Sequence, residues 1–243
     1  MEIGFIGCGN MAQAMISGIV AGGLLEPEEI MASNRSQDKL RAFGQDLKIK
    51  LARTNRQLAE EARIIVLAVK PQFYRQVLGE IGPLLGGEKI LVSLAPSFSL
   101  EELGQILGQD VKIIRAMPNT PAMVGEGMTA LAKNDLVSPQ EAQELEELFS
   151  SFGSCQLLAE DMMDAVVAVS GSSPAYIFML LEALADGAVL EGMARDQAYK
   201  FAGQAVLGSA KLLLETGLHP GILKDMVCSP AGTTIEAVKV LEE

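Results

Sequence analysis

Three small residues near the start of the chain have a spacing that suits dinucleotide binding. Gly7, Gly9 and Ala12 follow an apolar run at residues 3–6, which predicts a buried strand, and helix formers begin at Asn10. A glycine turn between strand and helix lets a pyrophosphate approach free backbone N–H groups and the positive end of the helix dipole. Ala12 replaces the usual third glycine, an accepted variant. Glycine turns also join strands to helices for structural reasons, so the motif alone leaves both interpretations open.

The residues that follow the second predicted strand indicate which nucleotide is bound. An NAD enzyme carries Asp or Glu at this place, where the acid binds the ribose 2′-hydroxyl. This chain has Ser33, Asn34, Arg35 and Ser36 instead. Because a guanidinium matches phosphate geometry, Arg35 favours the 2′-phosphate of NADP(H), with NAD(H) as the weaker alternative cofactor. The competing interpretation is that Arg35 is an exposed loop charge without a ligand.

Other kinds of catalytic centre lack the residues they need. His219 is the only histidine, which excludes a histidine-based catalytic triad and a histidine-rich metal site, so no metal is expected. Cys8, Cys155 and Cys228 are odd in number and far apart, which fits neither a disulfide framework nor a zinc site but suits a reducing cytoplasm. A bound cofactor is therefore expected to carry the chemistry.

Composition limits the partners and the location. The chain has 243 residues, 49% of them hydrophobic, and a net charge of −12, which argues against nucleic-acid binding and favours small-molecule partners. No secretory signal precedes the first strand. The longest apolar stretch, residues 176–190, contains Glu182 and Asp186 and is expected to be too short to cross a bilayer. A soluble cytoplasmic protein without membrane contact is expected.

The pattern of elements predicts two domains. Apolar runs at residues 29–34, 63–71, 89–96 and 111–118 alternate with amphipathic stretches, which indicates βαβ units and a parallel sheet. Beyond residue 161 no clear strands follow. We therefore expect an α/β Rossmann-like nucleotide-binding domain at residues 1–158 and an all-α domain at residues 159–243.

Two helices are predicted in the second domain. One covers residues 174–193, with Ser173 as its N-cap and Pro174 at its first position, and the other covers residues 195–217 and stops at Gly217. The first is apolar nearly all round, more than a domain of this size can easily bury. A partner subunit would cover it in a homodimer; the alternative is that it packs on the first domain.

Segments along the whole chain resemble pyrroline-5-carboxylate reductases. They are GFIGCGNMA, SNRS, AVKPQ, RAMPNTPAMVGEGMTAL, SGSSPAYIF and HPGILKDMVCSPAGTTIEAV, in the order and at the spacing of that family. The resemblance implies a Rossmann-like domain, a helical dimerisation domain and an active site shaped by both protomers, with rings of dimers in some members. The implied reaction is NADPH-dependent reduction of 1-pyrroline-5-carboxylate to L-proline, the last step of proline biosynthesis.

The resemblance also implies binding residues. Those for the cofactor lie at the phosphate turn, after the second strand, beside the adenosine and on a loop next to the nicotinamide: Ile6, Gly7, Cys8, Gly9, Asn10, Met11, Asn34, Arg35, Ser36, Asn55, Ala68, Val69, Lys70, Pro71, Met117, Pro118 and Asn119. Those for the substrate form one loop before a helix: Ser229, Pro230, Ala231, Gly232, Thr233 and Thr234, with Thr234 nearest the ring nitrogen in a catalytic role. Taken without the resemblance, the first loop also reads as a proline-bounded connector and the second as helix-capping residues.

Two departures and two rival functions accompany the resemblance. Most relatives have Gly where this chain has Ala231, and many have Gly in place of Ser173; alanine at 231 is tolerated only if the backbone there does not need a positive φ. A β-hydroxyacid dehydrogenase would need a Lys in a G-x-x-x-K pattern, whereas Lys211 follows Gly208 one residue too early. A non-catalytic NADP-sensing module has no use for the SPAGTT loop.

Because an imine nitrogen is basic enough to be protonated before hydride attack, the reduction needs positioning rather than a strong protein acid.

Overall fold

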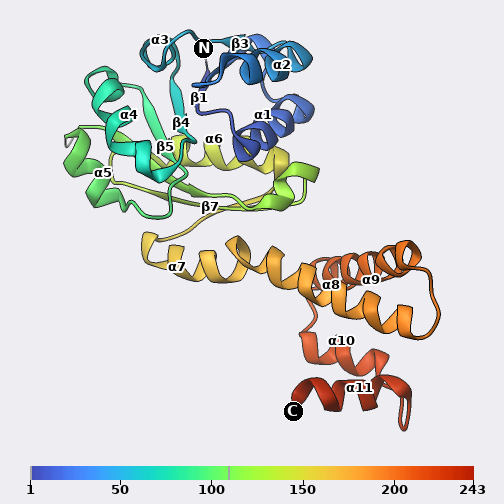
Figure 1. Ribbon diagram of the computed structural model, residues 1–243. Coiled ribbons are helices and arrows are strands. Elements are labelled where there is room, and N and C mark those ends of the chain that lie inside the picture. The colour runs from blue at the N-terminus through green and yellow to red at the C-terminus, as the bar shows by residue number, and fades with distance from the viewer. Residues whose placement is uncertain (1, 109) are drawn as a thin grey trace. The chain divides into compact units, whose positions relative to one another are not determined.

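The computed structural model describes residues 2–108 and 110–243. By its internal contacts the chain divides into two units, Met1–Pro174 and Ala175–Glu243. The first unit carries the sheet and the helices α1 to α7, and the second consists of helices (Figure 1).

Within the described residues, the first unit holds an eight-stranded sheet in the order β3-β2-β1-β4-β5-β6-β7-β8. The strands are β1 Ile3–Ile6, β2 Ile30–Ser33, β3 Lys50–Leu51, β4 Ile64–Leu67, β5 Ile90–Ser93, β6 Lys112–Met117, β7 Gly127–Lys133 and β8 Gly153–Leu157. The strands from β3 to β6 are parallel, as predicted, but β7 runs antiparallel to β6. The predicted α/β domain with a mostly parallel sheet is confirmed, and the antiparallel pairing of β7 with β6 is an addition that the sequence did not indicate. The link from β6 to β7 is a short turn at Thr120–Val124, too short for the crossover that a parallel neighbour requires.

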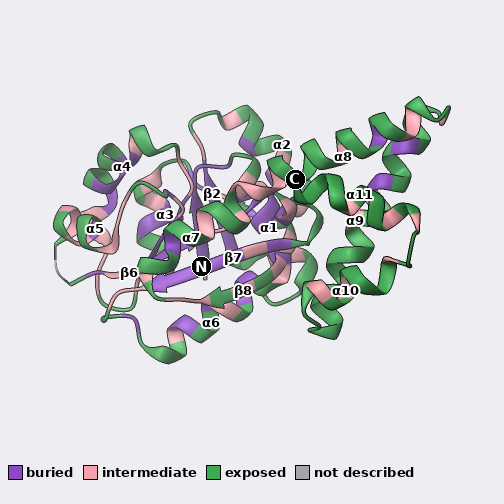
Figure 2. Cartoon of the chain, turned by 90° about the horizontal axis from the view of Figure 1, so that it is seen from below, coloured by how far each residue is buried: buried purple, intermediate pink, exposed green. Residues whose placement is uncertain are grey.

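Helices cover both faces of this sheet. They are α1 Asn10–Gly22, α2 Gln37–Leu47, α3 Asn55–Glu61, α4 Tyr74–Ile81, α5 Leu100–Leu107 and α6 Pro139–Phe149. One core cluster joins α1, α2 and α6 to Ile64 and Val66 of β4, and another joins α3, α4 and α5 to Ile65 and Leu67 of the same strand. All four of these side chains are buried, which is why the run is apolar without alternation. Figure 2 shows buried residues, in purple, along strands of this sheet.

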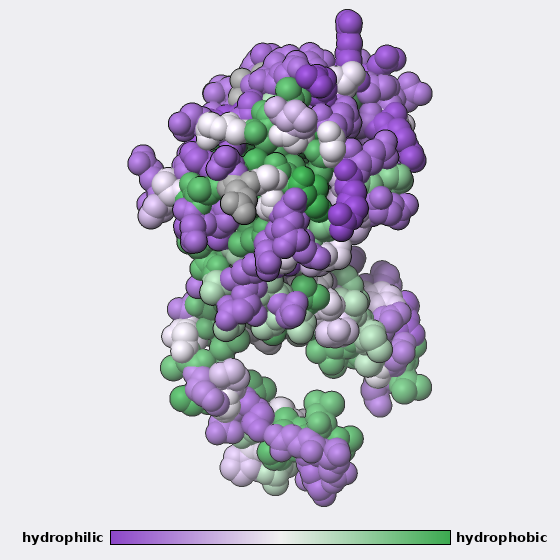
Figure 3. Space-filling model, turned by 90° about the vertical axis from the view of Figure 1, so that its left-hand side faces the viewer, coloured by the Kyte–Doolittle hydropathy of each residue, from purple (hydrophilic) through white to green (hydrophobic). Residues whose placement is uncertain are grey.

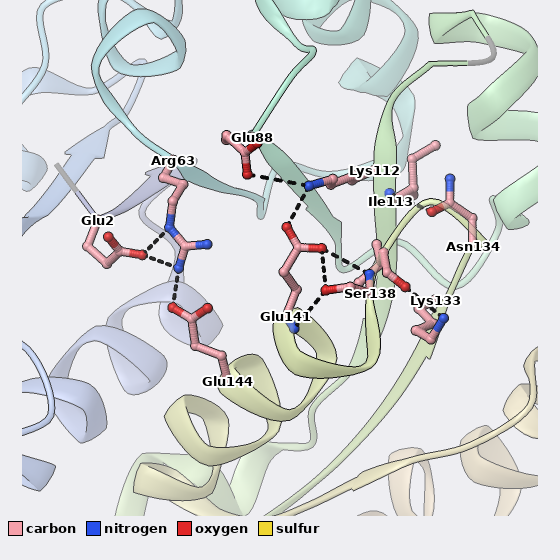
Figure 4. Close-up of polar contacts among 11 residues, drawn as sticks. Glu2, Arg63, Glu88, Lys112, Ile113, Lys133, Asn134, Ser138, Glu141 and Glu144 are labelled. Atoms are coloured by element: carbon pink, nitrogen blue, oxygen red, sulfur yellow. Dashed lines mark hydrogen bonds and ion pairs between the residues drawn. The ribbon is translucent and has the colours of Figure 1, made fainter.

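An ion-pair network ties α6 to the start of β6. Lys112 Nζ donates to Glu141 Oε1 at 2.6 Å and lies 3.7 Å from Glu88 Oε2 (Figure 4). Glu141 also forms a capping box with Ser138 at the beginning of α6. Burial acts against ionisation of Glu141, but the bonds from Lys112 and Ser138 outweigh it and lower the pKa of this carboxyl to about 2. The carboxyl of Glu141 is therefore ionised in the folded protein at neutral pH.

The predicted start of the first long helix is wrong. Ser173 is the first residue of α8, Ser173–Leu190, rather than an N-cap, because helix already precedes it: α7 at Met163–Val166 and a π-helical turn at Val167–Gly171. Pro174 has no N–H for the carbonyl of Ser170, four residues earlier. That carbonyl instead accepts a hydrogen bond from Asn119 Nδ2 at 3.0 Å. The helix can thus continue through a proline that the sequence suggested as its start.

The second unit leaves most of its apolar side chains exposed. After α8 come α9 Arg195–Thr216, α10 Pro220–Val227 and α11 Thr233–Glu242, and α9 ends at Gly217 as predicted. Among the described residues of α8 to α11, only Ala185, Ala198 and Ala202 are fully buried. Met179 is 67% exposed and Phe201 is 69% exposed. Figure 2 shows these helices coloured mostly as exposed. Figure 3 shows apolar residues among polar ones on the surface of this unit.

One helical run is longer than the sequence suggested. The run Glu160–Leu190 has 31 residues and contains a window of mean hydropathy 1.4, with 0% of that window buried. By length and composition alone this run is long enough to cross a membrane, although the apolar stretch at residues 176–190 within it is shorter than a span requires. Its length arises because the helix continues through Pro174.

Candidate functional site

The candidate site lies where the chain reverses its direction of travel across the sheet. β2 and β3 lie on one side of β1, and β4 and β5, which come later in the chain, lie on its other side. A crevice opens at the carboxyl ends of strands at such a switch point, and nucleotides bind there in doubly wound folds. The cleft has a volume of about 790 Å³. Its lining comes from the loops after β1, β2, β3 and β4 and from α4: Gly7, Cys8, Gly9, Ser33, Asn34, Arg35, Gln37, Arg53, Thr54, Asn55, Ala68, Val69, Lys70, Phe73, Gln76, Val77 and Glu80.

The two glycines of the first turn are required for different reasons. Gly7 has φ of 94°, and a Cβ there would lie 2.9 Å from the backbone of Ala68, so the fold itself demands glycine. Gly9 has an ordinary φ of −83°, and a Cβ there would meet nothing within 4 Å. Neither the backbone conformation nor packing requires glycine at position 9, and folding favours it over alanine only through the preference at a helix N-cap. A ligand that approaches the backbone closely does require glycine, and a dinucleotide pyrophosphate fits that requirement.

The start of α1 can receive an anion. Gly9 is its N-cap, no side chain caps the helix, and no acid stands in its first turn. Unpaired N–H groups at a helix start, together with the helix dipole, attract phosphate. Cys8 is buried within this turn, and burial raises the pKa of its thiol to about 11, so that the side chain carries no charge at neutral pH. The turn is thus free of negative charge.

Positive charge predominates along the cleft. Arg35, Arg53 and Lys70 line it, against the single carboxylate of Glu80, which gives three positive charges and one negative in a chain of net charge −12. Glu80 accepts a hydrogen bond from Asn55 Nδ2 at 3.0 Å, and Asn55 Oδ1 accepts one from Ser33 Oγ at 2.9 Å. The local excess of positive charge suits a polyanionic nucleotide.

About half of the expected cofactor residues line this cleft. They are Gly7, Cys8, Gly9, Asn34, Arg35, Asn55, Ala68, Val69 and Lys70. Outside the lining, Ile6 is buried in β1, Asn10 and Met11 begin α1, and Ser36 and Pro71 stand beside lining residues. The sequence interpretation missed eight lining residues: Ser33, Gln37, Arg53, Thr54, Phe73, Gln76, Val77 and Glu80. The last three share one face of α4, a spacing that could have signalled them.

The loop after β6 lies outside the cleft lining. Met117 ends β6, and Pro118 and Asn119 follow. The side chain of Asn119 is 9% exposed, and it bonds within the chain on both sides: Nδ2 donates to the carbonyl of Ser170, and Oδ1 accepts from the Met128 N–H at 2.8 Å. The side-chain amide therefore holds the loop in place. Contact of this loop with a nicotinamide stays a prediction.

The expected substrate loop precedes α11 in the second unit. Gly232 is the N-cap of α11, with no side-chain capping bond, and its N–H donates to the Ser229 carbonyl at 3.0 Å. Thr233 and Thr234 are the first residues of the helix rather than its cap. Ala231 has φ of 56°, so the backbone here does adopt the positive φ that favours glycine. The condition for tolerating alanine at 231 is not met, and this residue is strained.

The lysine considered for the rival dehydrogenase chemistry is paired within its own helix. Lys211 Nζ lies 3.5 Å from Glu215 Oε1 within α9, and its side chain is 69% exposed. In the described residues no group of three or more His, Cys, Asp or Glu could hold a metal ion.

Known families match the chain over both units. A family model described as pyrroline-5-carboxylate reductase dimerisation matches residues 160–243, and one described as NADP oxidoreductase, coenzyme F420-dependent, matches residues 2–97. The pyrroline-5-carboxylate reductase of Escherichia coli (strain K12) is 53% identical over 242 residues, which are 100% of this chain and 90% of that protein. The chain belongs to the pyrroline-5-carboxylate reductase family.

Solved structures of this family have the same fold. A pyrroline-5-carboxylate reductase from Coxiella burnetii matches with a TM-score of 0.93 and 38% identity, over 99% of this chain and 90% of that one. The Plasmodium falciparum enzyme, solved with NADP bound, matches with a TM-score of 0.89 and 30% identity, over 100% of this chain and 89% of that one. The predicted family, its oxidoreductase activity in proline biosynthesis, and the order of a nucleotide-binding α/β domain before a helical dimerisation domain are confirmed.

Proposed function

We propose that this reductase converts 1-pyrroline-5-carboxylate to L-proline with NADPH as the hydride donor. The cleft at the switch point of the sheet carries the proposal, because it combines an anion-binding helix start, a glycine with open space beside it, and an excess of positive charge. The full-length identity to pyrroline-5-carboxylate reductases supports the choice of substrate.

NADP(H) is the proposed cofactor in preference to NAD(H). The lining residues that follow β2 include Arg35 and no acid, and the guanidinium of Arg35 lies over the ring of Phe73 at 5.6 Å. This contact orients a cation toward the 2′-phosphate, which is absent from NAD(H). Bound NADPH supplies the hydride, and the chain supplies the geometry.

The loop from Ser229 to Thr234 is the proposed substrate site. The uncapped start of α11 offers backbone N–H groups to the substrate carboxylate, and the Thr234 hydroxyl accepts or donates a hydrogen bond at the ring nitrogen. The imine is protonated before hydride transfer, so the remaining task of these residues is to orient the imine carbon. Met117, Pro118 and Asn119 complete the nicotinamide side of this proposal.

We further propose that the chain forms a homodimer, which can assemble into larger rings of dimers. The proposed boundary between the nucleotide-binding domain and the helical domain lies between residues 158 and 159. The exposed apolar side chains of α8 and α9 support burial against a second copy, since the dimerisation family model covers them. The same burial accounts for the apolar run Glu160–Leu190 without a membrane. A cytoplasmic location, small-molecule partners and no binding of nucleic acid complete the proposal.

A comparison of two substrate pairs tests the reaction. We expect oxidation of NADPH in the presence of pyrroline-5-carboxylate, measured by the absorbance of NADPH. We expect no reduction of NADP in the presence of 3-hydroxyisobutyrate. The reverse pattern would favour a β-hydroxyacid dehydrogenase. NADPH binding without turnover on either substrate would favour a non-catalytic sensing module.

The role of Thr234 is tested by a pair of neighbouring variants. Thr234→Ala should lower kcat/KM for pyrroline-5-carboxylate by roughly ten- to a hundredfold, as expected for one hydrogen bond lost in a desolvated site, and should leave NADPH affinity unchanged. Thr233→Ala removes the neighbouring hydroxyl, which has no proposed bond to the ring nitrogen, and should lower kcat/KM less than Thr234→Ala does. If both variants keep full turnover, the substrate is held elsewhere.

A further inference from the structure

Arg53 stands next to the expected 2′-phosphate site although it comes from a different loop. Strands β2 and β3 are parallel, and Ala32 pairs with Leu51. Asn34 and Arg53 each lie two residues beyond that pair, at the same edge of the sheet. Both residues line the cleft, as does Arg35. The topology therefore brings two arginines together at the adenosine end of the cleft.

The backbone that carries Arg53 is held in place. Gln57 Oε1 accepts a hydrogen bond from the Arg53 N–H at 2.9 Å, and the Gln57 N–H donates to Thr54 Oγ1 at 3.0 Å. These two bonds fix the turn between β3 and α3. The Arg53 guanidinium itself has no hydrogen bond, ion pair or aromatic contact among the residues that the structure describes. An unpaired cation is thus presented on a rigid turn.

The charge of a phosphate monoester requires more than one cation. A phosphate monoester carries about −1.5 to −2 charge at neutral pH, which one guanidinium only half neutralises. The carboxylate of the lining, Glu80, is engaged by Asn55 and so does not pair with Arg53. We infer that Arg53 and Arg35 together bind the 2′-phosphate of NADP(H), and that Arg53 is a determinant of cofactor specificity. This inference rests on the proposed use of NADP(H).

The alternative is that Arg53 is a solvated surface charge, and the neighbouring Arg56 shows what such a residue looks like. Arg56 Nε lies 3.2 Å from Glu60 Oε1 within α3, in an exposed ion pair outside the cleft lining. Arg56→Ala is therefore a matched control for Arg53→Ala: the two substitutions remove the same side chain from the same segment.

Calorimetric titration of the full-length protein with 2′,5′-ADP and with 5′-AMP tests the inference. Arg53→Ala should weaken 2′,5′-ADP binding about tenfold or more and leave 5′-AMP binding unchanged, because a charge-assisted bond to the phosphate is lost. Arg53→Lys, which keeps the charge, should recover part of the affinity. Arg35→Ala should give a similar selective loss, and the double variant should lose the preference for 2′,5′-ADP.

The outcomes separate this inference from the proposed function. If the wild type prefers 2′,5′-ADP and Arg53→Ala keeps that preference, or weakens both nucleotides equally, the role of Arg53 is refuted and the NADP(H) assignment stands. If the wild type binds both nucleotides equally, the NADP(H) assignment fails and the role of Arg53 fails with it. A loss as large in Arg56→Ala would mean that the effect is one of general charge, which also refutes the inference.

Discussion

Removal of the Asn119 side chain should destabilise the protein through two backbone groups that the side chain serves. Asn119→Ala leaves the Met128 N–H and the Ser170 carbonyl without their partners at 2.8 and 3.0 Å. Each polar group left unsatisfied inside a protein costs about 1–3 kcal/mol, so the variant should lose about 2–6 kcal/mol of unfolding free energy. Urea unfolding of the whole chain measures this loss, at one fixed protomer concentration because a dimer's stability depends on it.

Pro174→Ala provides the decisive comparison. It restores an N–H four residues after Ser170, so the carbonyl of Ser170 gains a second donor. In that background the cost of Asn119→Ala should fall by about 1 kcal/mol, the worth of one hydrogen bond. The effects of Pro174→Ala on the unfolded chain cancel in this double-mutant cycle. Strict additivity of the two substitutions would refute the idea that Asn119 serves the carbonyl left free by Pro174.

Three further outcomes are expected. The pKa of Glu141 is lowered in the folded state, so the contribution of its charge to stability is present above about pH 4.5 and is lost as the pH falls toward 2. Glu141→Gln should therefore cost at most about 3 kcal/mol of unfolding free energy at pH 7, and its difference from wild type in urea unfolding should be smaller at pH 3. A pH-independent difference would exclude the ion pair with Lys112 as its cause. Ala231→Gly should raise the unfolding free energy by about 0.5–1 kcal/mol, since relief of the positive φ exceeds the added entropy of the unfolded chain; a decrease would show that Ala231 is not strained. Met179→Glu, at an exposed position of the lone chain, should yield monomeric or insoluble inactive protein, and a soluble active monomer by light scattering would contradict the shared interface.

The strands of the nucleotide-binding unit could be predicted where burial leaves a clear pattern. β1, β2, β4 and β5 are covered on both faces, so each is a run of apolar or small residues. β3 has only two residues, Lys50 and Leu51, which is too few for any periodicity to appear. The cleft residues of the loop after β3 were missed for the same reason.

Other features depend on contacts between distant residues and therefore leave no local signal. Ser173 followed by Pro174 has the pattern of a helix start, yet the helix continues because Asn119, more than fifty residues earlier, bonds the carbonyl that Pro174 cannot. The positive φ of Ala231 is a different case, since alanine itself gives no signal of it and only the glycine that most relatives carry at this position raised the question. By contrast, Gly7 and Gly9 were recognisable because their spacing within one turn is a known pattern.

The open space around Gly9 separates two kinds of selection on this protein. A methyl group at position 9 meets no atom of the chain, whereas at Gly7 it would meet the backbone of Ala68. Measurements of folding therefore register position 9 only through the helix N-cap, where alanine costs about 1 kcal/mol or less relative to glycine, so a laboratory evolution campaign that ranks variants by thermal stability would penalise alanine there only weakly. A measurement with the nucleotide present would register the change far more strongly, so a library built on this scaffold has to be sorted for ligand binding as well as for folding.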